Sequence, residues 1–215
     1  MTTDTAEVLA ISTEPDPTPL VKIFANKFRK ALTDAKFANY VRNFHGSFAL
    51  ASLKDPQSLT IIVGNGKISI THGIAANAEI IIRMDFDKPV KPKIEGLFRH
   101  PMLALRISKL LQFPETNWAD AATGFWDCNS TYPGMPGNIK IHCIDEDRDF
   151  ILGDLPTDGN PDMHISGKGI DIADVFSGGS VFVQALMTGR IKSIASFEHT
   201  VVLSDVTVQT LLGER

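Results

Sequence analysis

Between residues 19 and 42, apolar residues recur every three or four positions, which predicts an amphipathic helix. The lysines of this segment fall on the other side of that helix, so one face should pack against a core. Thr33-Asp34 leaves open whether the segment forms one helix or two. Residues 1–18 are polar and contain prolines, and we expect them to form a flexible leader.

Four β-branched or aromatic runs follow, separated by turn residues. They are Phe48–Leu53, Ser58–Gly64, Lys67–Thr71 and Glu79–Phe86. Asn65-Gly66 favours a type I′ hairpin, because both central residues of that turn need a positive φ. Apolar and polar positions alternate along these runs, which predicts an antiparallel sheet whose apolar face is covered by helices.

Helical spacing returns between Ile94 and Leu111, where His100-Pro101 separates a short helix from a longer one. The next segment, Thr116–Gly137, contains both tryptophans together with several Gly and Pro residues. We expect an aromatic loop there, either a lid over an apolar pocket or a loop anchored in the core by Trp. A hairpin built from Asn138–Ile144 and Asp149–Leu152 should follow.

The stretch Asp171–Ser196 predicts two short helices and a strand, and the rest of the chain is organised around it. Gly178-Gly179 ends the first helix and Gly189 ends the second. Arg190–Ser196 has the composition of a strand. Val201–Leu212 fits either a strand followed by a helix or a single helix.

The order of elements in this stretch resembles that of a known family. A short helix ending in Phe176-Ser177-Gly178, a second helix ending in Gly189 and a basic-flanked strand resemble the C-terminal half of the sterol carrier protein 2 (sterol-binding) domain. The resemblance runs from His164 to Leu212, and Phe48–Phe86 is similar in order to the first strands of that family. It implies an α+β fold, with an antiparallel-rich twisted sheet and helices covering one face around a hydrophobic tunnel for a lipid.

On this basis we expect residues 19–215 to form a single sterol carrier-like domain, with an aromatic loop and hairpin inserted at about 113–153. Residues 94–105 and 172–182 share a faint pattern of apolar residues, Phe, a breaker and a helix. A true repeat would give two half-domains that share one sheet or one cavity. The alternative is that any two amphipathic helices look alike.

The residues predicted to line the tunnel are large, apolar and drawn from the helices, the aromatic loop and the last strand: Phe98, Met102, Leu105, Trp118, Trp126, Phe176, Phe182, Leu186 and Ile191. Burying an acyl chain gains ~0.8 kcal/mol for each CH₂ group, so a lipid site needs only an apolar channel and one polar group at its mouth. The same residues at the same spacing would also form an ordinary core.

Charge and motifs exclude several functions. The 21 Lys and Arg residues against 25 Asp and Glu residues leave a net charge of −4, and no basic cluster interrupts that balance, so we expect no nucleic-acid partner. The six histidines are scattered singly and no catalytic motif is present, so we expect no catalytic residue, metal or cofactor. Cys128 and Cys143 lack C-x-x-C spacing, which favours free thiols.

The N-terminal residues carry acidic side chains and no long apolar run, so we expect a soluble cytoplasmic protein with at most transient membrane contact. Its expected function is to carry or present a sterol, a fatty acyl chain or another lipid or isoprenoid, with a partner enzyme as one recipient. One alternative is a small enzyme that acts on an apolar substrate under the aromatic lid, with His100 or His164 as proton carrier. Another is an interaction module without a ligand.

Overall fold

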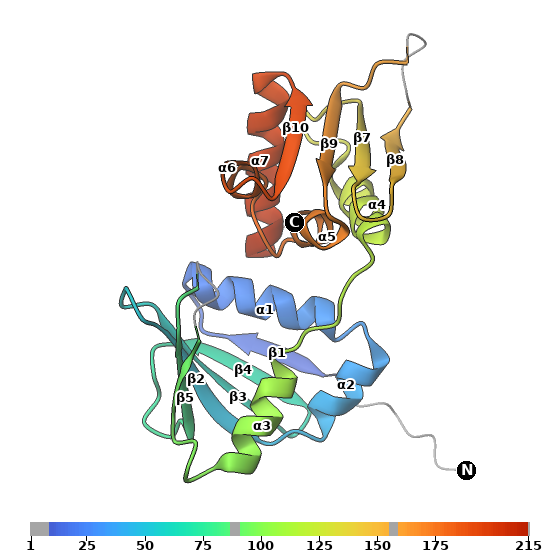
Figure 1. The fold of residues 1–215 in the computed structure, drawn as a ribbon. Coiled ribbons are helices and arrows are strands. Elements are labelled where there is room, and N and C mark those ends of the chain that lie inside the picture. Colours follow the sequence, from blue (N-terminus) through green and yellow to red (C-terminus); the bar gives the residue numbers. More distant parts are fainter. Residues whose placement is uncertain (1–8, 87–90, 155–158, 215) are drawn as a thin grey trace, which may run out of the picture. The chain divides into compact units, whose positions relative to one another are not determined.

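The computed structural model describes residues 9–86, 91–154 and 159–214. The chain divides into two compact units, which we call unit 1 (Met1–Pro114) and unit 2 (Glu115–Arg215), and each has its own sheet and its own hydrophobic core (Figure 1). Both units combine helices with mostly antiparallel mixed sheets, so the predicted α+β class is confirmed. The expected single domain over 19–215 is replaced by two separately packed units.

The sheet of unit 1 has the strand order β1-β4-β3-β2-β5-β6. Its strands are β1 (Ala10–Thr13), β2 (Gly46–Ser52), β3 (Ser58–Gly64), β4 (Lys67–His72), β5 (Ile80–Met84) and β6 (Lys93–Glu95). The meander β2–β3–β4 is antiparallel, whereas β5 pairs with β2 in parallel. The alternation of apolar residues therefore predicted the four central strands correctly.

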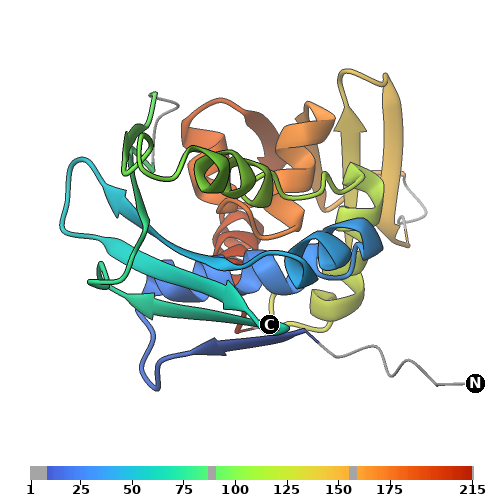
Figure 2. The ribbon, with the colours of Figure 1, turned by 90° about the horizontal axis from the view of Figure 1, so that it is seen from below.

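Three helices cover the apolar face of this sheet: α1 (Pro19–Ala31), α2 (Ala35–Arg42) and α3 (Pro101–Leu110). Figure 2 shows α1 and α2 along one side of the unit 1 strands. The predicted helical segment is two helices because Asp34 caps α2, its side chain accepting a hydrogen bond from Phe37 N at 2.7 Å. Phe28 of α1 is fully buried between the helices and the sheet.

The expected leader contains a strand. Of residues 1–18, only 9–18 are described, and within them β1 pairs in parallel with β4, from Ala10 opposite Lys67 to Thr13 opposite Ile70. The alternation of Ala10, Ile11 and Ser12 is too short to distinguish a strand from a coil by sequence alone. A flexible leader is therefore a wrong prediction for Ala10–Thr13, and residues 1–8 lie outside the described residues.

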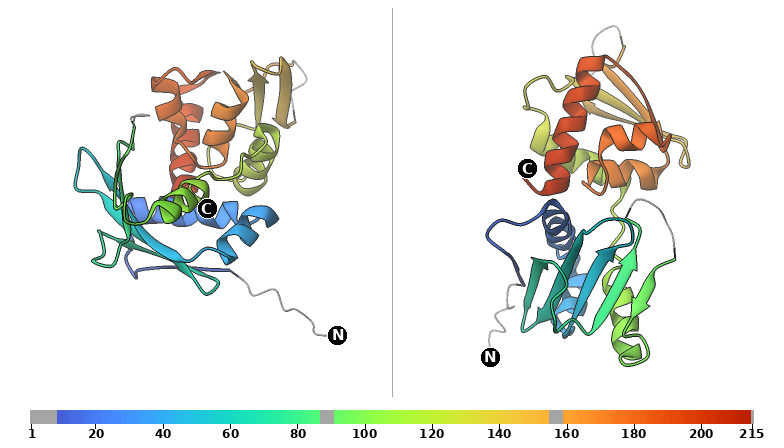
Figure 3. Two further views of the ribbon diagram at one scale, coloured as in Figure 1. Left: turned by 60° about the horizontal axis from the view of Figure 1, so that its bottom comes forward. Right: turned by 90° about the vertical axis from the view of Figure 1, so that its left-hand side faces the viewer.

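Unit 2 contains a four-stranded sheet in the order β10-β9-β7-β8. Its elements are α4 (Trp118–Asn129), β7 (Asn138–Cys143), β8 (Arg148–Gly153), β9 (Met163–Gly167), α5 (Gly169–Phe176), α6 (Phe182–Met187), β10 (Ile191–Ala195) and α7 (Phe197–Leu212). Figure 3 shows α7 lying along one face of these strands. The predicted succession of two helices and a strand is confirmed by α5, α6 and β10, and 201–212 belongs to a single helix.

One expectation for the middle of the chain is wrong and one is confirmed. Most of the aromatic segment is not a loop, because Trp118–Asn129 forms α4. The predicted hairpin is confirmed as β7–β8, and β7 also pairs in parallel with β9 near the centre of the second sheet. Residues 113–153 therefore include the beginning of unit 2.

Four strands of each sheet share one order. In unit 1, β3-β2-β5-β6 are neighbours, with β2 antiparallel to β3, β5 parallel to β2 and β6 antiparallel to β5; β4 lies between β3 and β5 in the chain and pairs on the outer side of β3. In unit 2, β8-β7-β9-β10 have the same order and the same pairing directions. The repeat suggested by the sequence is a different one, because α3 follows the last strand of its sheet whereas α5 and α6 lie between β9 and β10. The two units also share no sheet among the described residues.

Candidate functional site

Six of the nine residues predicted to line a tunnel lie together in the core of unit 2. They are Trp118 and Trp126 of α4, Phe176 of α5, Phe182 and Leu186 of α6, and Ile191 of β10. With the inward-facing strand residues Ile139, Ile141 and Ile165 they fill the space between helices and sheet, which we call the core layer of unit 2. These six residues meet, but in a packed core, and their role as the wall of a ligand tunnel stays a prediction.

The other three predicted residues lie in unit 1 and are exposed. The exposed fractions are 98% for Phe98, 71% for Met102 and 65% for Leu105. Ile107 and Leu110 of the same helix are fully buried instead. The apolar residues of α3 occupy both faces of the helix, so their spacing does not indicate which face is covered.

Trp118 enters the core layer because α4 begins at that residue. The Asn117 side chain accepts hydrogen bonds from Ala119 N at 2.9 Å and Asp120 N at 3.3 Å, which is a helix N-cap. The Trp118 ring is 3% exposed and stands edge-on to Phe150, with ring centroids 5.9 Å apart. The aromatic segment is thus anchored in the core, and Trp118 cannot serve as a surface lid.

Three buried polar atoms of unit 2 find no hydrogen-bond partner among the residues that the structure describes: Trp118 Nε1, Ser193 Oγ and His199 Nδ1. Ser193 is two residues from Ile191 on β10 and so lies on the same side of the sheet, toward the core layer. A buried donor or acceptor without a partner costs about 1–3 kcal/mol. Each of these atoms would therefore gain from a polar group brought in by a bound molecule.

The outer face of the same sheet carries a cluster of charged and titratable side chains. His142 of β7 lies directly opposite Asp149 of β8, and His142 Nδ1 is 2.8 Å from Asp149 Oδ1. Lys140 Nζ lies 2.8 Å from the other carboxylate oxygen, and Lys140 is opposite His164 of β9. These four residues, Lys140, His142, Asp149 and His164, form what we call the outer-face cluster.

Two side chains of the outer-face cluster have shifted pKa values. The hydrogen bond from Lys140, with a second from His142, lowers the pKa of Asp149. Burial lowers the pKa of His164, and the positive charge of Lys140 lowers it further. Both effects disfavour the charged form of His164. His100, the other proton carrier considered from sequence, lies in unit 1 with Nδ1 4.0 Å from Glu79 Oε1.

The acidic turn between β7 and β8 has a structural role. Asp145 Oδ1 accepts hydrogen bonds from Cys143 Sγ at 2.9 Å and from Gly169 N at 2.8 Å, which ties the end of β7 to the start of α5. These bonds lower the pKa of Asp145, whereas burial raises the pKa of the Cys143 thiol. Both cysteines are free, as predicted. Over residues 9–86, 91–154 and 159–214, no three His, Cys, Asp or Glu side chains are placed to hold a metal ion.

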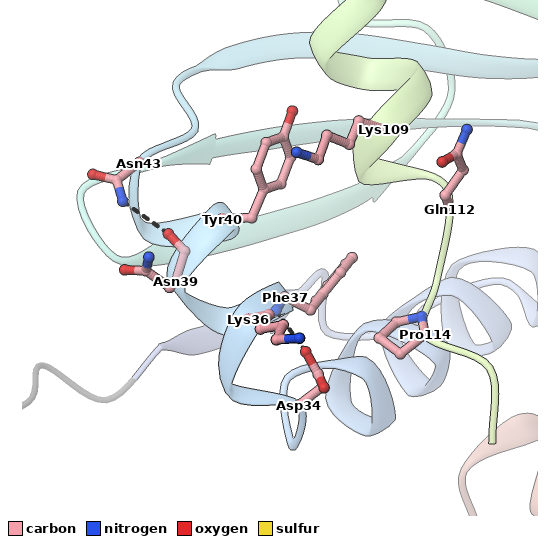
Figure 4. Close-up of a pocket in the computed structure, with 9 residues that line it drawn as sticks. All are labelled: Asp34, Lys36, Phe37, Asn39, Tyr40, Asn43, Lys109, Gln112 and Pro114. Atoms are coloured by element: carbon pink, nitrogen blue, oxygen red, sulfur yellow. Dashed lines mark hydrogen bonds between the residues drawn. The ribbon is translucent and has the colours of Figure 1, made fainter. Parts of the chain in front are cut away.

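Unit 1 has a groove between α2 and the end of α3, with a volume of about 530 Å³ (Figure 4). It is lined mostly by polar side chains: Asp34, Lys36, Phe37, Asn39, Tyr40, Asn43, Lys109, Gln112 and Pro114. Lys109 Nζ lies 4.9 Å from the centroid of the Tyr40 ring, and Tyr40 Oη donates to Arg106 O at 2.8 Å. The sequence did not predict this groove, because its lining comes from two segments, 34–43 and 109–114, that are far apart in the chain.

In the described parts of the chain, no helix is both long enough and apolar enough to cross a membrane. In comparisons with known proteins, no family model, curated protein or solved structure matches the chain.

Proposed function

We propose that unit 2 binds a hydrophobic ligand, such as a sterol, a fatty acyl chain or another lipid, in its core layer, and carries or presents it. The observation that supports this most directly is the unpartnered Trp118 Nε1, because a buried N–H donor within an apolar layer is suited to a ligand hydroxyl or carboxylate. The resemblance of His164–Leu212 to the sterol-binding domain points to the same layer.

The energetics of such binding need few polar contacts. Burying about ten CH₂ groups would gain about 8 kcal/mol before the costs of ordering the ligand are subtracted. A hydrogen bond to Trp118 Nε1 would orient the polar end. The ligand would have to displace side chains of α6, a helix of six residues between Gly178 and Gly189, both of which adopt positive φ.

The first experiment is native mass spectrometry of the whole chain purified without detergent, followed by solvent extraction and identification of the bound molecule. We expect a stoichiometric lipid. The matched variants are Trp118→Phe, which removes the unpartnered N–H and keeps a ring, and Trp126→Phe, which changes the half-buried tryptophan of the same helix.

Trp118→Phe should weaken binding of a fluorescent fatty acid about fivefold or more while Trp126→Phe changes it little, because only the first removes the buried, unpartnered N–H donor. A protein that is empty in the mass spectrum and does not bind the fatty acid or a sterol probe would contradict this proposal. That result would favour the alternative that the chain is an interaction module without a ligand. Equal effects of the two variants would remove Trp118 from the site.

The outer-face cluster favours a second candidate, proton transfer to or from an apolar substrate. His142 hydrogen-bonded to Asp149 is the arrangement of an oriented general base, and His164, whose pKa is lowered by burial, is the register partner of Lys140. The aromatic lid expected for such an enzyme is absent from the described residues, since Trp118 is in the core. Substrate turnover that His164→Ala abolishes without loss of lipid binding would support this second function.

A further inference from the structure

The three most exposed large apolar side chains described in unit 1 are Phe98, Met102 and Leu105, with exposed fractions of 98%, 71% and 65%. They lie on one continuous stretch of chain with Ile94 of β6 and Leu97, which are 40% and 38% exposed. We call this surface the α3 shoulder. Met102 and Leu105 are three residues apart and share a helix face, while Ile107 and Leu110 face the core. Met102 and Leu105 are therefore exposed because they lie on the face of α3 that points away from the core.

The backbone holds the tip of the α3 shoulder in place. Arg99 N and His100 N both donate to Gly96 O at 3.0 Å, which closes a tight turn with Leu97 and Phe98 at its tip. Gly96 adopts a φ of +85°, and a Cβ atom there would lie 2.5 Å from Glu79 O. Only glycine fits this position without strain, so the turn presents Phe98 to solvent as a fixed projection.

The α3 shoulder lies on a basic stretch of an acidic protein. Residues 91–109 contain five cationic residues and one acidic residue, and five minus one gives +4, whereas the whole chain carries −4. The cations are Lys91, Lys93, Arg99, Arg106 and Lys109. Glu95 is neutralised by Arg83 at 2.6 Å, while Lys91, Lys93 and Arg99 form no ion pair with another described residue. Apolar residues separate these cations, so they do not form a basic run.

We propose that the α3 shoulder docks on an anionic lipid surface. Phe98 and Leu97 would insert between the lipid headgroups, Met102 and Leu105 would lie at the boundary of the acyl chains, and Lys93 and Arg99 would contact headgroup phosphates. An apolar surface flanked by cations is the pattern of interfacial membrane binding, and each cation near an anionic leaflet strengthens it severalfold.

A second copy of this chain fits the α3 shoulder less well. A symmetric dimer through this surface would place one +4 segment against another, and such like-charge contact opposes association. The proposal goes beyond ligand binding in unit 2 and does not depend on it, because every residue involved belongs to unit 1.

The test is flotation of the whole chain with vesicles of phosphatidylcholine alone and with about 30% phosphatidylserine. The double variant Phe98→Ser Met102→Ser should bind the anionic vesicles at least tenfold more weakly than the parent. Lys93→Gln Arg99→Gln should lose about fivefold per cation on anionic vesicles and little on neutral ones. The control is Phe197→Ser, which changes a phenylalanine of unit 2 that is 85% exposed and should leave binding unchanged.

Parent binding that falls as salt is raised, together with the two selective losses, would support the proposal. No binding of the parent to anionic vesicles would overturn it, as would equal losses for Phe98→Ser Met102→Ser and Phe197→Ser. A parent dimer in light scattering that Phe98→Ser Met102→Ser converts to a monomer, without vesicle binding, would overturn it as well and assign the α3 shoulder to a second copy.

Discussion

Unit 1 and unit 2 should unfold as separate cooperative units, because each hydrophobic core is built only from residues of its own unit. Phe48 of unit 1 is 0% exposed and Phe176 of unit 2 is 3% exposed. Replacing either by Ala removes a buried ring and should cost about 4 kcal/mol of unfolding free energy. With an m-value of about 2 kcal/mol per molar urea, the midpoint of the affected unit should fall by about 2 M.

The chain offers a selective probe for this experiment. Both tryptophans, Trp118 and Trp126, belong to α4 of unit 2, so tryptophan fluorescence follows unit 2 alone while far-ultraviolet circular dichroism follows both units. Phe176→Ala should shift the fluorescence midpoint and Phe48→Ala should leave it in place. A shift of equal size for Phe48→Ala would refute the reasoning and show that the chain unfolds as one unit.

A milder pair keeps the experiment informative if the alanine variants do not fold. Ile61 of unit 1 and Ile165 of unit 2 are both buried inner-face residues, with exposed fractions of 0% and 1%. Ile→Val costs about 1 kcal/mol at such positions, a shift of about 0.5 M urea. Only Ile165→Val should move the fluorescence transition.

Two further outcomes follow from particular residues. Gly153 and Gly159 both have a φ of +75°, but a Cβ atom on Gly153 would collide with Gly137 O and lie 2.8 Å from the Trp126 ring, whereas Gly159 has nothing within 4 Å. Gly153→Ala should therefore lower the fluorescence-detected unfolding free energy by at least about 2 kcal/mol more than Gly159→Ala, and equal losses would show that the ring and backbone yield. Burial lowers the pKa of His164 in the folded state, so the unfolded state binds the proton more readily and the unfolding free energy should fall as pH drops below about 6.5. Urea titrations at pH values of about 7.5 and about 5.5, on either side of the ordinary histidine pKa, should show a smaller drop for His164→Gln than for the parent; an identical drop would assign the pH dependence to other groups.

Local patterns predicted much of the fold. The apolar–polar alternation of β3 and β4 and the Asn65-Gly66 turn predict the position and antiparallel pairing of these two strands. The parallel pairing of β5 with β2 does not follow from sequence. In α4, by contrast, three of the six buried positions are Ala119, Ala121 and Ala122, and these small residues produce a weaker hydrophobic period than large apolar ones. The N-cap Asn117 was the available signal for a helix there.

The division into two units could not be predicted from the sequence, because the strand patterns do not show which strands share a sheet. A parallel pairing such as β7 with β9 joins segments that are not adjacent in the chain, and the sequence does not mark which hairpin a later strand will join. The candidate site, too, was only partly predictable from sequence. Large aromatic residues of unit 2 were predicted to meet and do so, whereas the side of α3 that stays exposed depends on what packs against it, and unpartnered atoms such as Trp118 Nε1 emerge only from the packing.

The short strand β1 has a practical consequence for anyone who truncates this chain. β1 pairs along one side of β4 and satisfies its backbone N–H and C=O groups, which a shortened chain beginning at residue 19 would leave open. An open edge with the apolar residues Ile68 and Ile70 is a template for intermolecular strand addition. Removing the N-terminal segment for convenience would therefore promote aggregation, so Ala10–Thr13 should be kept.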